Sequence, residues 1–179
     1  MKLLTVVGAR PQFVKAAALS KSISDTKGGT NPIHEKILHT GQHFDERMSN
    51  QFFTELGIPE PTINLGIGGG SHGSNTGRML IAIEEILNND RPDFLLVYGD
   101  TDSTLAGALA ASKLKIPILH IEAGLRSFNR NQPEEQNRVL TDHLSEICFS
   151  PTDIAVDNLK KEGIAPHRIV RTGDVMADS

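Results

Sequence analysis

Short apolar runs alternate with longer stretches of helical periodicity along the whole chain. The apolar runs predict strands at residues 3–7, 36–39, 94–98, 118–121, 147–150 and 169–171. The periodic stretches predict helices at residues 13–23, 45–56, 74–87, 104–113, 134–144 and 152–161. The uninterrupted apolar run 94–98 is typical of a strand covered on both faces. Strand and helix alternate throughout, which predicts an α/β fold: a Rossmann-like, doubly wound parallel sheet.

Composition limits the classes of protein to which the chain can belong. The 179 residues fit one domain, and 38% are hydrophobic while 22% are charged, as in ordinary soluble domains. The chain has no Trp and one Tyr, so we expect an aliphatic core. The net charge of −4 argues against nucleic acid as a partner, because affinity for a phosphate backbone comes largely from Lys and Arg.

The single cysteine, Cys148, excludes a disulfide within the chain, and its apolar strand context predicts a buried, inert thiol. The first residues lack the pattern of a signal peptide, and no apolar run approaches membrane-spanning length. We therefore expect a cytoplasmic protein with no membrane contact.

The first two predicted strands are followed by groups suited to a polar ligand. A glycine turn leads from Gly8 into a helix that carries Arg10 and Lys15, and a helix N-terminus of this kind favours anions. The alternative is two solvated basic residues. After the second strand, Gln42 and His43 could donate hydrogen bonds to a sugar or nucleotide. His43 also stands four residues after His39, but a strand and turn without a third ligand predict no metal site.

Carboxylates stand at the ends of two predicted strands and at the start of a later predicted helix. Asp100 and Glu122 come at the ends of the runs 94–98 and 118–121, and Glu134 shares a helix face with Arg138 at the i, i+4 spacing. Ligands of doubly wound sheets bind beyond the carboxyl ends of the strands, so these groups should share a crevice. Neighbouring carboxylates raise at least one pKa, which lets one act as acid while another acts as base. Alternatively, Glu134 is a surface residue favoured by the helix dipole.

Two motifs indicate other functions. Residues 68–73 match both GxGxxG and GxSxG, but only a weak strand precedes them, so neither dinucleotide binding nor a serine nucleophile is expected. Asp100 and Asp102 form a DxDxT pattern, and Asp174 and Asp178 follow in a GDxxxD pattern. That order is typical of magnesium-dependent phosphatases of the haloacid dehalogenase type. Against it, Gly99 separates Asp100 from its strand, the first half of the chain stays unexplained, and Asp102 could instead cap the next helix.

Together, five motifs resemble the non-hydrolysing UDP-N-acetylglucosamine 2-epimerases. They are Gly8-x-Arg10-Pro11 with Lys15, Thr40-Gly41-Gln42-His43, Gly99-Asp100-Thr101, Glu122-Ala123-Gly124-Leu125-Arg126 and Pro133-Glu134-Glu135-x-Asn137-Arg138. The resemblance implies catalytic roles for Asp100, Glu122 and Glu134, and substrate contacts for Arg10, Lys15, Gln42, His43 and Arg138. The short loop 126–133 is more similar to relatives that act on modified sugars, such as a diacetamido uronic acid.

The resemblance further implies the N-terminal half of a glycosyltransferase-B-like, two-domain fold. Residues 1–172 would form this domain and 173–179 the start of a linker, with the nucleotide-binding C-terminal domain absent and the fragment alone inactive. The family reaction converts UDP-GlcNAc to UDP-ManNAc through elimination of UDP to a glycal and its re-addition, without metal or other cofactor. A homodimer serving surface polysaccharide synthesis is expected. A non-catalytic nucleotide-sugar binding module is the alternative.

Overall fold

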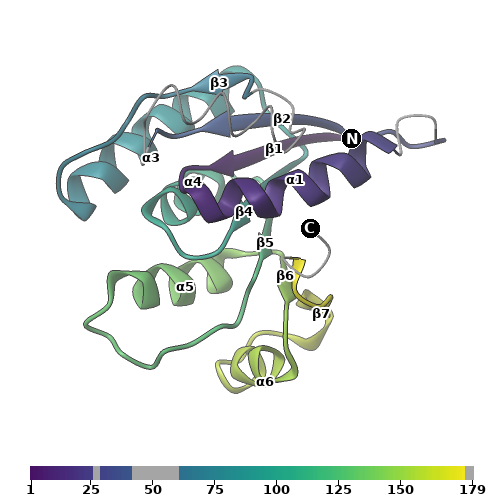
Figure 1. Cartoon of the computed structure of the whole chain (residues 1–179), viewed down its shortest axis with the longest axis vertical. Helices are drawn as coiled ribbons and strands as arrows, with labels where there is room; N and C mark the ends of the chain where they lie inside the picture. Colours follow the sequence, from purple (N-terminus) through teal and green to yellow (C-terminus); the bar gives the residue numbers. More distant parts are fainter. Residues whose placement is uncertain (26–28, 42–60, 176–179) are drawn as a thin grey trace.

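The structure, a computed structural model, describes residues 1–25, 29–41 and 61–175. Gln42, His43, Asp178 and the predicted helix 45–56 lie outside this part. The strands are β1 (Lys2–Val7), β2 (His34–His39), β3 (Ile63–Asn64), β4 (Phe94–Tyr98), β5 (Ile118–Ile121), β6 (Ile147–Ser150) and β7 (Ile169–Arg171). The helices are α1 (Arg10–Asp25), α3 (His72–Asn89), α4 (Asp102–Lys113), α5 (Pro133–Leu144), α6 (Asp153–Lys161) and the 3₁₀ turn η2 (Pro166–Arg168) (Figure 1).

The described strands form one parallel sheet in the order β3-β2-β1-β4-β5-β6-β7. β1 lies in the interior of the sheet and pairs with β2 on one side and β4 on the other, so the chain reverses its direction of travel across the sheet at this point. Such a switch point opens a crevice at the carboxyl ends of the strands. The Rossmann-like parallel fold predicted from the sequence is confirmed.

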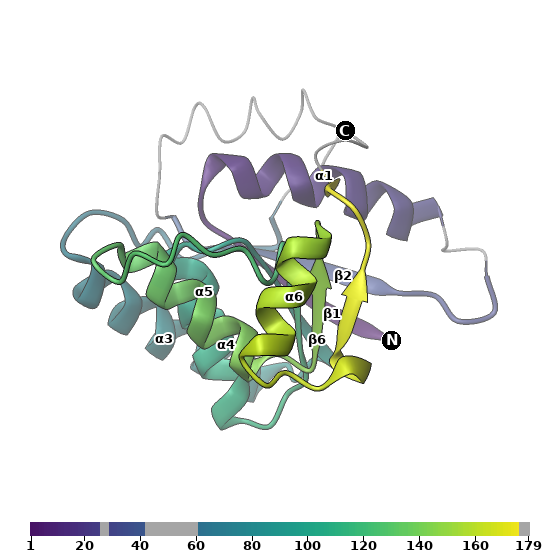
Figure 2. The same ribbon diagram turned by 90° about the horizontal axis from the view of Figure 1, so that it is seen from below.

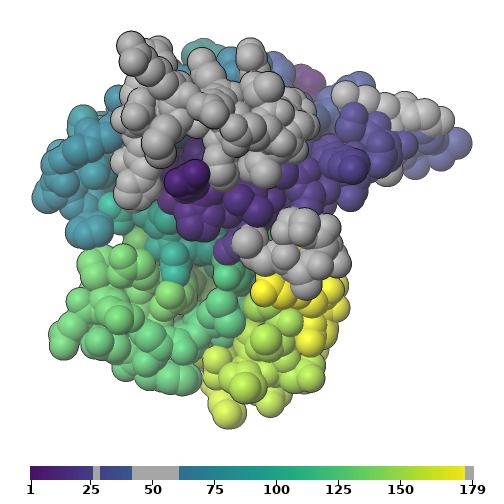
Figure 3. Space-filling model, viewed as in Figure 1, coloured from purple at the N-terminus to yellow at the C-terminus, as the bar shows by residue number. Residues whose placement is uncertain are grey.

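Helices cover both faces of the sheet (Figure 2). On one face, Leu4, Val6 and Val97 pack against apolar residues of α3 and α4. On the other face, Phe13 and Ala16 of α1 pack against a second set of strand side chains. Strand side chains alternate between faces, so β1 and β4 need apolar residues at nearly every position, which explains their uninterrupted runs. In Figure 3 the purple segment that contains α1 lies above the green and yellow segments that contain α5 and α6.

Helix α4 lies close to the sheet because its inner face is built from small residues. Ala106, Ala108, Ala110 and Ala111 are fully buried. A Cβ added to Gly107 would lie 3.4 Å from Cγ1 of Val97, in ordinary contact with the strand below. This close packing fixes the start of α4, and with it the loop that follows β4.

Polar caps set several helix starts, and two of them lie earlier than predicted. Ser71 caps α3, and Thr101 caps α4 in a reciprocal capping box with Thr104, so both helices begin two residues before the predicted positions. Asp102 is therefore the first residue of α4 and not its cap. The sequence prediction also missed β3, a strand of only two residues. No described helix combines the length and the apolar character that crossing a bilayer requires.

Candidate active site

A buried glutamine joins the ends of β1 and β4 where the crevice opens. The side-chain oxygen of Gln12 accepts hydrogen bonds from the backbone N–H groups of Gly8 (2.8 Å) and Ala9 (3.0 Å). Its nitrogen donates to the carbonyl of Tyr98 (2.7 Å) and to Oγ1 of Thr104 (2.9 Å). The amides of Gly8 and Ala9, which the sequence suggested for anion binding, are thus occupied within the protein. Any anion at this helix would have to use other donors.

Lys15 and Glu122 form an ion pair across the crevice. Lys15 lies one turn into α1 and only 11% of its side chain is exposed, whereas Glu122 directly follows β5. The backbone of Glu122 has φ = +73°, a left-handed conformation that glycine adopts far more readily. Strain of this kind persists where the surrounding structure fixes the residue, and it is concentrated at functional sites. Arg10 is exposed at the start of the same helix α1.

Asp100 lies beside Glu122 at the adjacent strand end. The N–H of Gly99 donates to the carbonyl of Ile121 (3.0 Å), and a Cβ on Gly99 would lie 3.3 Å from a carboxylate oxygen of Glu122. Gly99 itself has φ = +62°, so the turn into Asp100 also requires the left-handed region. Asp100 and Glu122 therefore stand at neighbouring turns, after adjacent strands.

Arg138 of α5 pairs with the carboxylate of Asp100 and, at 2.9 Å, with that of Glu135. Asn137 holds the backbone of the same turn, donating to the carbonyl of Asp100 at 2.9 Å. Helix α5 thus reaches the end of β4 through two consecutive residues.

Two consecutive glutamates open α5 and have different surroundings. Glu134 is exposed, while Glu135 is buried and accepts hydrogen bonds from the N–H groups of Ser127 (2.9 Å) and Phe128 (2.8 Å). Burial raises the pKa of Glu135, but these amides and Arg138 outweigh it and lower that pKa to about 2. Glu135 therefore fixes the loop 126–130 as a permanent anion, whereas Glu134 is free to face a ligand.

The remaining motif residues have structural roles. Ser71, in the GxSxG pattern, accepts a hydrogen bond from the N–H of Ser74 as the cap of α3. Asp102 is buried and contacts Nδ1 of His72 (2.9 Å) and the amide of Asn137 (3.3 Å). Among the described residues, no group of three or more His, Cys, Asp or Glu side chains is placed to hold a metal ion.

A row of four ionisable side chains, three of them buried, was missed by sequence reasoning. It contains His120, Asp142, Arg126 and Glu162, from β5, α5, the loop after β5 and the C-cap of α6. Asp142 stands in a polar stretch of an amphipathic helix, where a surface position is the ordinary expectation. The available signal was His120, a polar residue in the middle of an apolar strand, because a buried imidazole needs partners.

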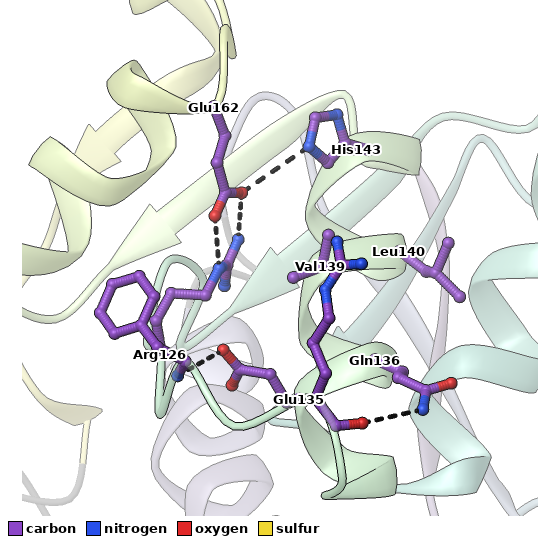
Figure 4. Close-up of a pocket in the computed structure, with 9 residues that line it drawn as sticks. Arg126, Glu135, Gln136, Val139, Leu140, His143 and Glu162 are labelled. Atoms are coloured by element: carbon purple, nitrogen blue, oxygen red, sulfur yellow. Dashed lines mark hydrogen bonds and ion pairs between the residues drawn. The ribbon is translucent and has the colours of Figure 1, made fainter.

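Two hollows flank the strand ends. A small one is lined by Lys15, Ile121, Glu122, Pro151, Gly173, Asp174 and Val175. A larger one of about 630 Å³ lies on the other side of α5, where Glu162 and Arg126 face each other (Figure 4). It is lined by Arg126, Phe128, Arg130, Glu135, Gln136, Val139, Leu140, His143 and Glu162. Asp100 and Glu122 do not line this larger hollow, so it is separate from the carboxylate pair.

Comparison with known proteins agrees with this geometry. The sequence profile described as UDP-N-acetylglucosamine 2-epimerase matches residues 28–179. The chain is 58% identical over 181 residues to UDP-2,3-diacetamido-2,3-dideoxy-D-glucuronate 2-epimerase of Pseudomonas aeruginosa, covering all of this chain and 50% of the relative. It is 49% identical over 179 residues to UDP-N-acetylglucosamine 2-epimerase of Methanocaldococcus jannaschii, covering all of this chain and 48% of the relative.

Solved structures give the same result. A crystal structure of the M. jannaschii enzyme in complex with UDP-GlcNAc and UDP superposes with a TM-score of 0.92 at 49% identity, covering 97% of this chain and 47% of that one. A lipopolysaccharide outer core galactosyltransferase, at 14% identity and a TM-score of 0.67, shares the fold alone.

The sheet order and the helices on both faces define a Rossmann-like α/β domain with charged side chains at its strand ends. The chain belongs to the UDP-N-acetylglucosamine 2-epimerase family. It spans about half the length of the curated relatives it matches. The phosphatase alternative gains no support, because the family accounts for the first half of the chain that the phosphatase pattern left unexplained.

Proposed function

We propose that this chain is the N-terminal domain of a UDP-HexNAc 2-epimerase and supplies its acid–base groups. Residues 1–172 form the domain and 173–179 begin a linker to a nucleotide-binding domain. The observation that carries the proposal is the pair Asp100 and Glu122 at adjacent strand ends, each held by its own cation, Arg138 or Lys15. Membership of the family supports the reaction class.

The reaction needs proton transfer at C2 of the sugar and cleavage at C1. A carboxylate removes the C2 proton while the C1–O bond breaks and its electron pair leaves with UDP, which gives a glycal. Re-addition of UDP at C1, with a proton delivered to C2 on the opposite face, gives the epimer. Two positioned carboxylates suit this sequence, because one accepts a proton and another returns one. We assign these roles to Asp100, Glu122 and the exposed Glu134, with Arg10, Lys15, Gln42, His43 and Arg138 contacting the substrate.

The test is turnover of the full-length protein with single isosteric substitutions. Asp100→Asn, Glu122→Gln and Glu134→Gln should each lower kcat by at least about 100-fold, the usual size of a lost acid–base contribution. Glu146→Gln, which changes an exposed glutamate outside the site, is the matched control and should retain activity. Unchanged turnover in all three variants would remove the mechanism. Binding of a UDP-sugar without any turnover of the unmodified protein would favour the binding-module alternative.

The sugar is tested in the same assay. Relatives named for UDP-GlcNAc and for UDP-2,3-diacetamido-2,3-dideoxy-D-glucuronate are both close in sequence. The short loop 126–133 favours the modified sugar, so kcat/KM should be higher for the diacetamido uronic acid than for UDP-GlcNAc. A higher value for UDP-GlcNAc would reverse this assignment.

The remaining parts of the proposal concern the cellular location, the oligomeric state and the use of the product. We propose a cytoplasmic homodimer whose product enters surface polysaccharide synthesis, as the family resemblance implies. Sedimentation equilibrium of the full-length protein should give twice the monomer mass, and a monomer at micromolar concentration would contradict the dimer.

A further inference from the structure

A continuous row of alternating charges runs from the larger hollow to the turn that carries Asp100. At its outer end, both carboxylate oxygens of Glu162 accept hydrogen bonds from Arg126, at 2.8 and 2.6 Å (Figure 4). Arg126 also reaches Oδ2 of Asp142 at 2.8 Å. Oδ1 of Asp142 lies 2.7 Å from Nδ1 of His120, and Nε2 of His120 lies 2.8 Å from the carbonyl oxygen of Gly99.

Asp142 is ionised in this row. Its carboxylate meets three donors: His120, Arg126 and the backbone N–H of Gly124 at 3.0 Å. Burial raises the pKa of Asp142, but its contacts with His120 and Arg126 outweigh burial and keep that pKa below its usual value. Asp142 therefore accepts from His120 and cannot donate to it.

Both ring nitrogens of His120 face acceptors. Nδ1 faces the carboxylate of Asp142, and Nε2 faces a backbone carbonyl, which has no proton to give. Rotating the ring by 180° would place carbon atoms at these positions, closer than the 3.3 Å or more that C–H groups keep from oxygen. The two contacts therefore fix the orientation of the ring between the carboxylate of Asp142 and the carbonyl of Gly99.

We propose that His120 is a positioning residue that fixes the Gly99–Asp100 peptide for catalysis. It holds the carbonyl on one side of Asp100, while Asn137 holds the carbonyl of Asp100 itself. His120 is fully buried, so neither of its contacts is shared with water. Its strand neighbours in register are Val97 of β4 and Cys148 of β6. Burial raises the pKa of the Cys148 thiol to about 12, so that neighbour stays neutral and Asp142 and Arg126 are the charges that face the ring.

The ring contacts are tested by NMR of the full-length protein labelled with ¹⁵N-histidine. The signal that disappears in His120→Gln identifies His120 among the seven histidines of this chain. We expect the ring N–H of His120 to exchange slowly with solvent, because the ring is fully buried and hydrogen-bonded. Fast exchange of this proton would overturn the proposal. The measurement does not depend on which reaction the enzyme catalyses, so it stands if the proposed function fails.

The positioning role rests on the proposed function and is tested by kinetics. His120→Gln replaces a two-sided donor with an amide that donates at only one end, so we expect kcat to fall about 10- to 100-fold with KM changed less than about twofold. The matched control is His167→Gln, which changes an exposed histidine of η2. If His120→Gln does not fold, Asp142→Asn serves instead, because it changes the carboxylate that orients the ring, and it should give the same loss in kcat. Wild-type kcat in a folded variant would exclude the role.

Discussion

Glu122 keeps a carboxylate where the backbone conformation favours glycine. A residue with a Cβ at φ = +73° costs about 1 kcal/mol or more relative to glycine. The surrounding contacts hold the residue there, with Lys15 on its carboxylate and its N–H donating to the carbonyl of Phe149 at 3.1 Å.

Replacement of Glu122 by glycine should therefore give a more stable protein than replacement by alanine. Both variants lose the carboxylate, so the difference isolates the backbone term, and we expect about 1 kcal/mol in favour of glycine by urea denaturation. At Glu134, on a regular helix, the order should be the reverse, with alanine more stable by about 0.5 to 1 kcal/mol. Alanine more stable at both positions would contradict the strained backbone.

Glu135 makes stability depend on pH. Its folded pKa of about 2 lies below the value of about 4.3 in an unfolded chain. Its stabilising effect is thus complete above about pH 4.5 and is lost as the pH falls toward 2, up to about 3 kcal/mol. Glu135→Gln should lower the free energy of unfolding markedly at pH 7 and much less at pH 2. Glu134→Gln, on the same helical turn without these contacts, should cost less than about 1 kcal/mol at pH 7.

At the scale of elements, α6 packs against the loop after β5 at a glycine. A Cβ on Gly124 would lie 2.4 Å from the carbonyl oxygen of Ala155, and Asn158 of α6 donates to the carbonyl of Gly124 at 3.0 Å. The position also has φ = +84°. Gly163, at the end of α6, has nearly the same φ of +85°, but a Cβ there would meet nothing within 4 Å.

Comparing alanine substitutions at these two glycines separates the cost of a strained backbone from the cost of a steric clash. Gly163→Ala should lower the free energy of unfolding by about 1 to 2 kcal/mol, the cost of a left-handed Cβ. Gly124→Ala should cost at least about 2 kcal/mol more, because α6 must move away from the loop. Chemical denaturation of both variants measures the difference. Equal losses would show that the contact with Ala155 relaxes without cost.

The predicted elements depended on how much local signal each carries. Long apolar runs predicted the six longer described strands, and their alternation with helical stretches predicted a parallel sheet. β3 has only two residues and is half-exposed, so it is too short to show a pattern. The candidate site followed from strand ends for Asp100 and Glu122. The partner of Arg138 in α5 is Glu135 at i, i+3, and spacing alone did not distinguish it from Glu134. His120 and Asp142 meet only through tertiary packing, which no spacing rule predicts.

At the scale of the whole molecule, the described carboxylates occupy one side of a crevice. The relatives are about twice as long as this chain, and we propose that their other half supplies the nucleotide-binding side. The 179-residue chain expressed alone should therefore show no epimerisation and only weak binding of UDP. Isothermal titration and a coupled epimerase assay measure both. Turnover by the separate chain at more than about 1% of the full-length rate would contradict the proposal that both halves are needed for catalysis.

The central place of β1 has a consequence for how the molecule is made. Leu3 of β1 is synthesised well before its partner Phe94 on β4. At about 5 to 20 residues per second, a ribosome needs on the order of ten seconds to produce that partner. During this interval one edge of β1 has no neighbour, so the nascent chain is most exposed to chaperones and to aggregation before β4 emerges.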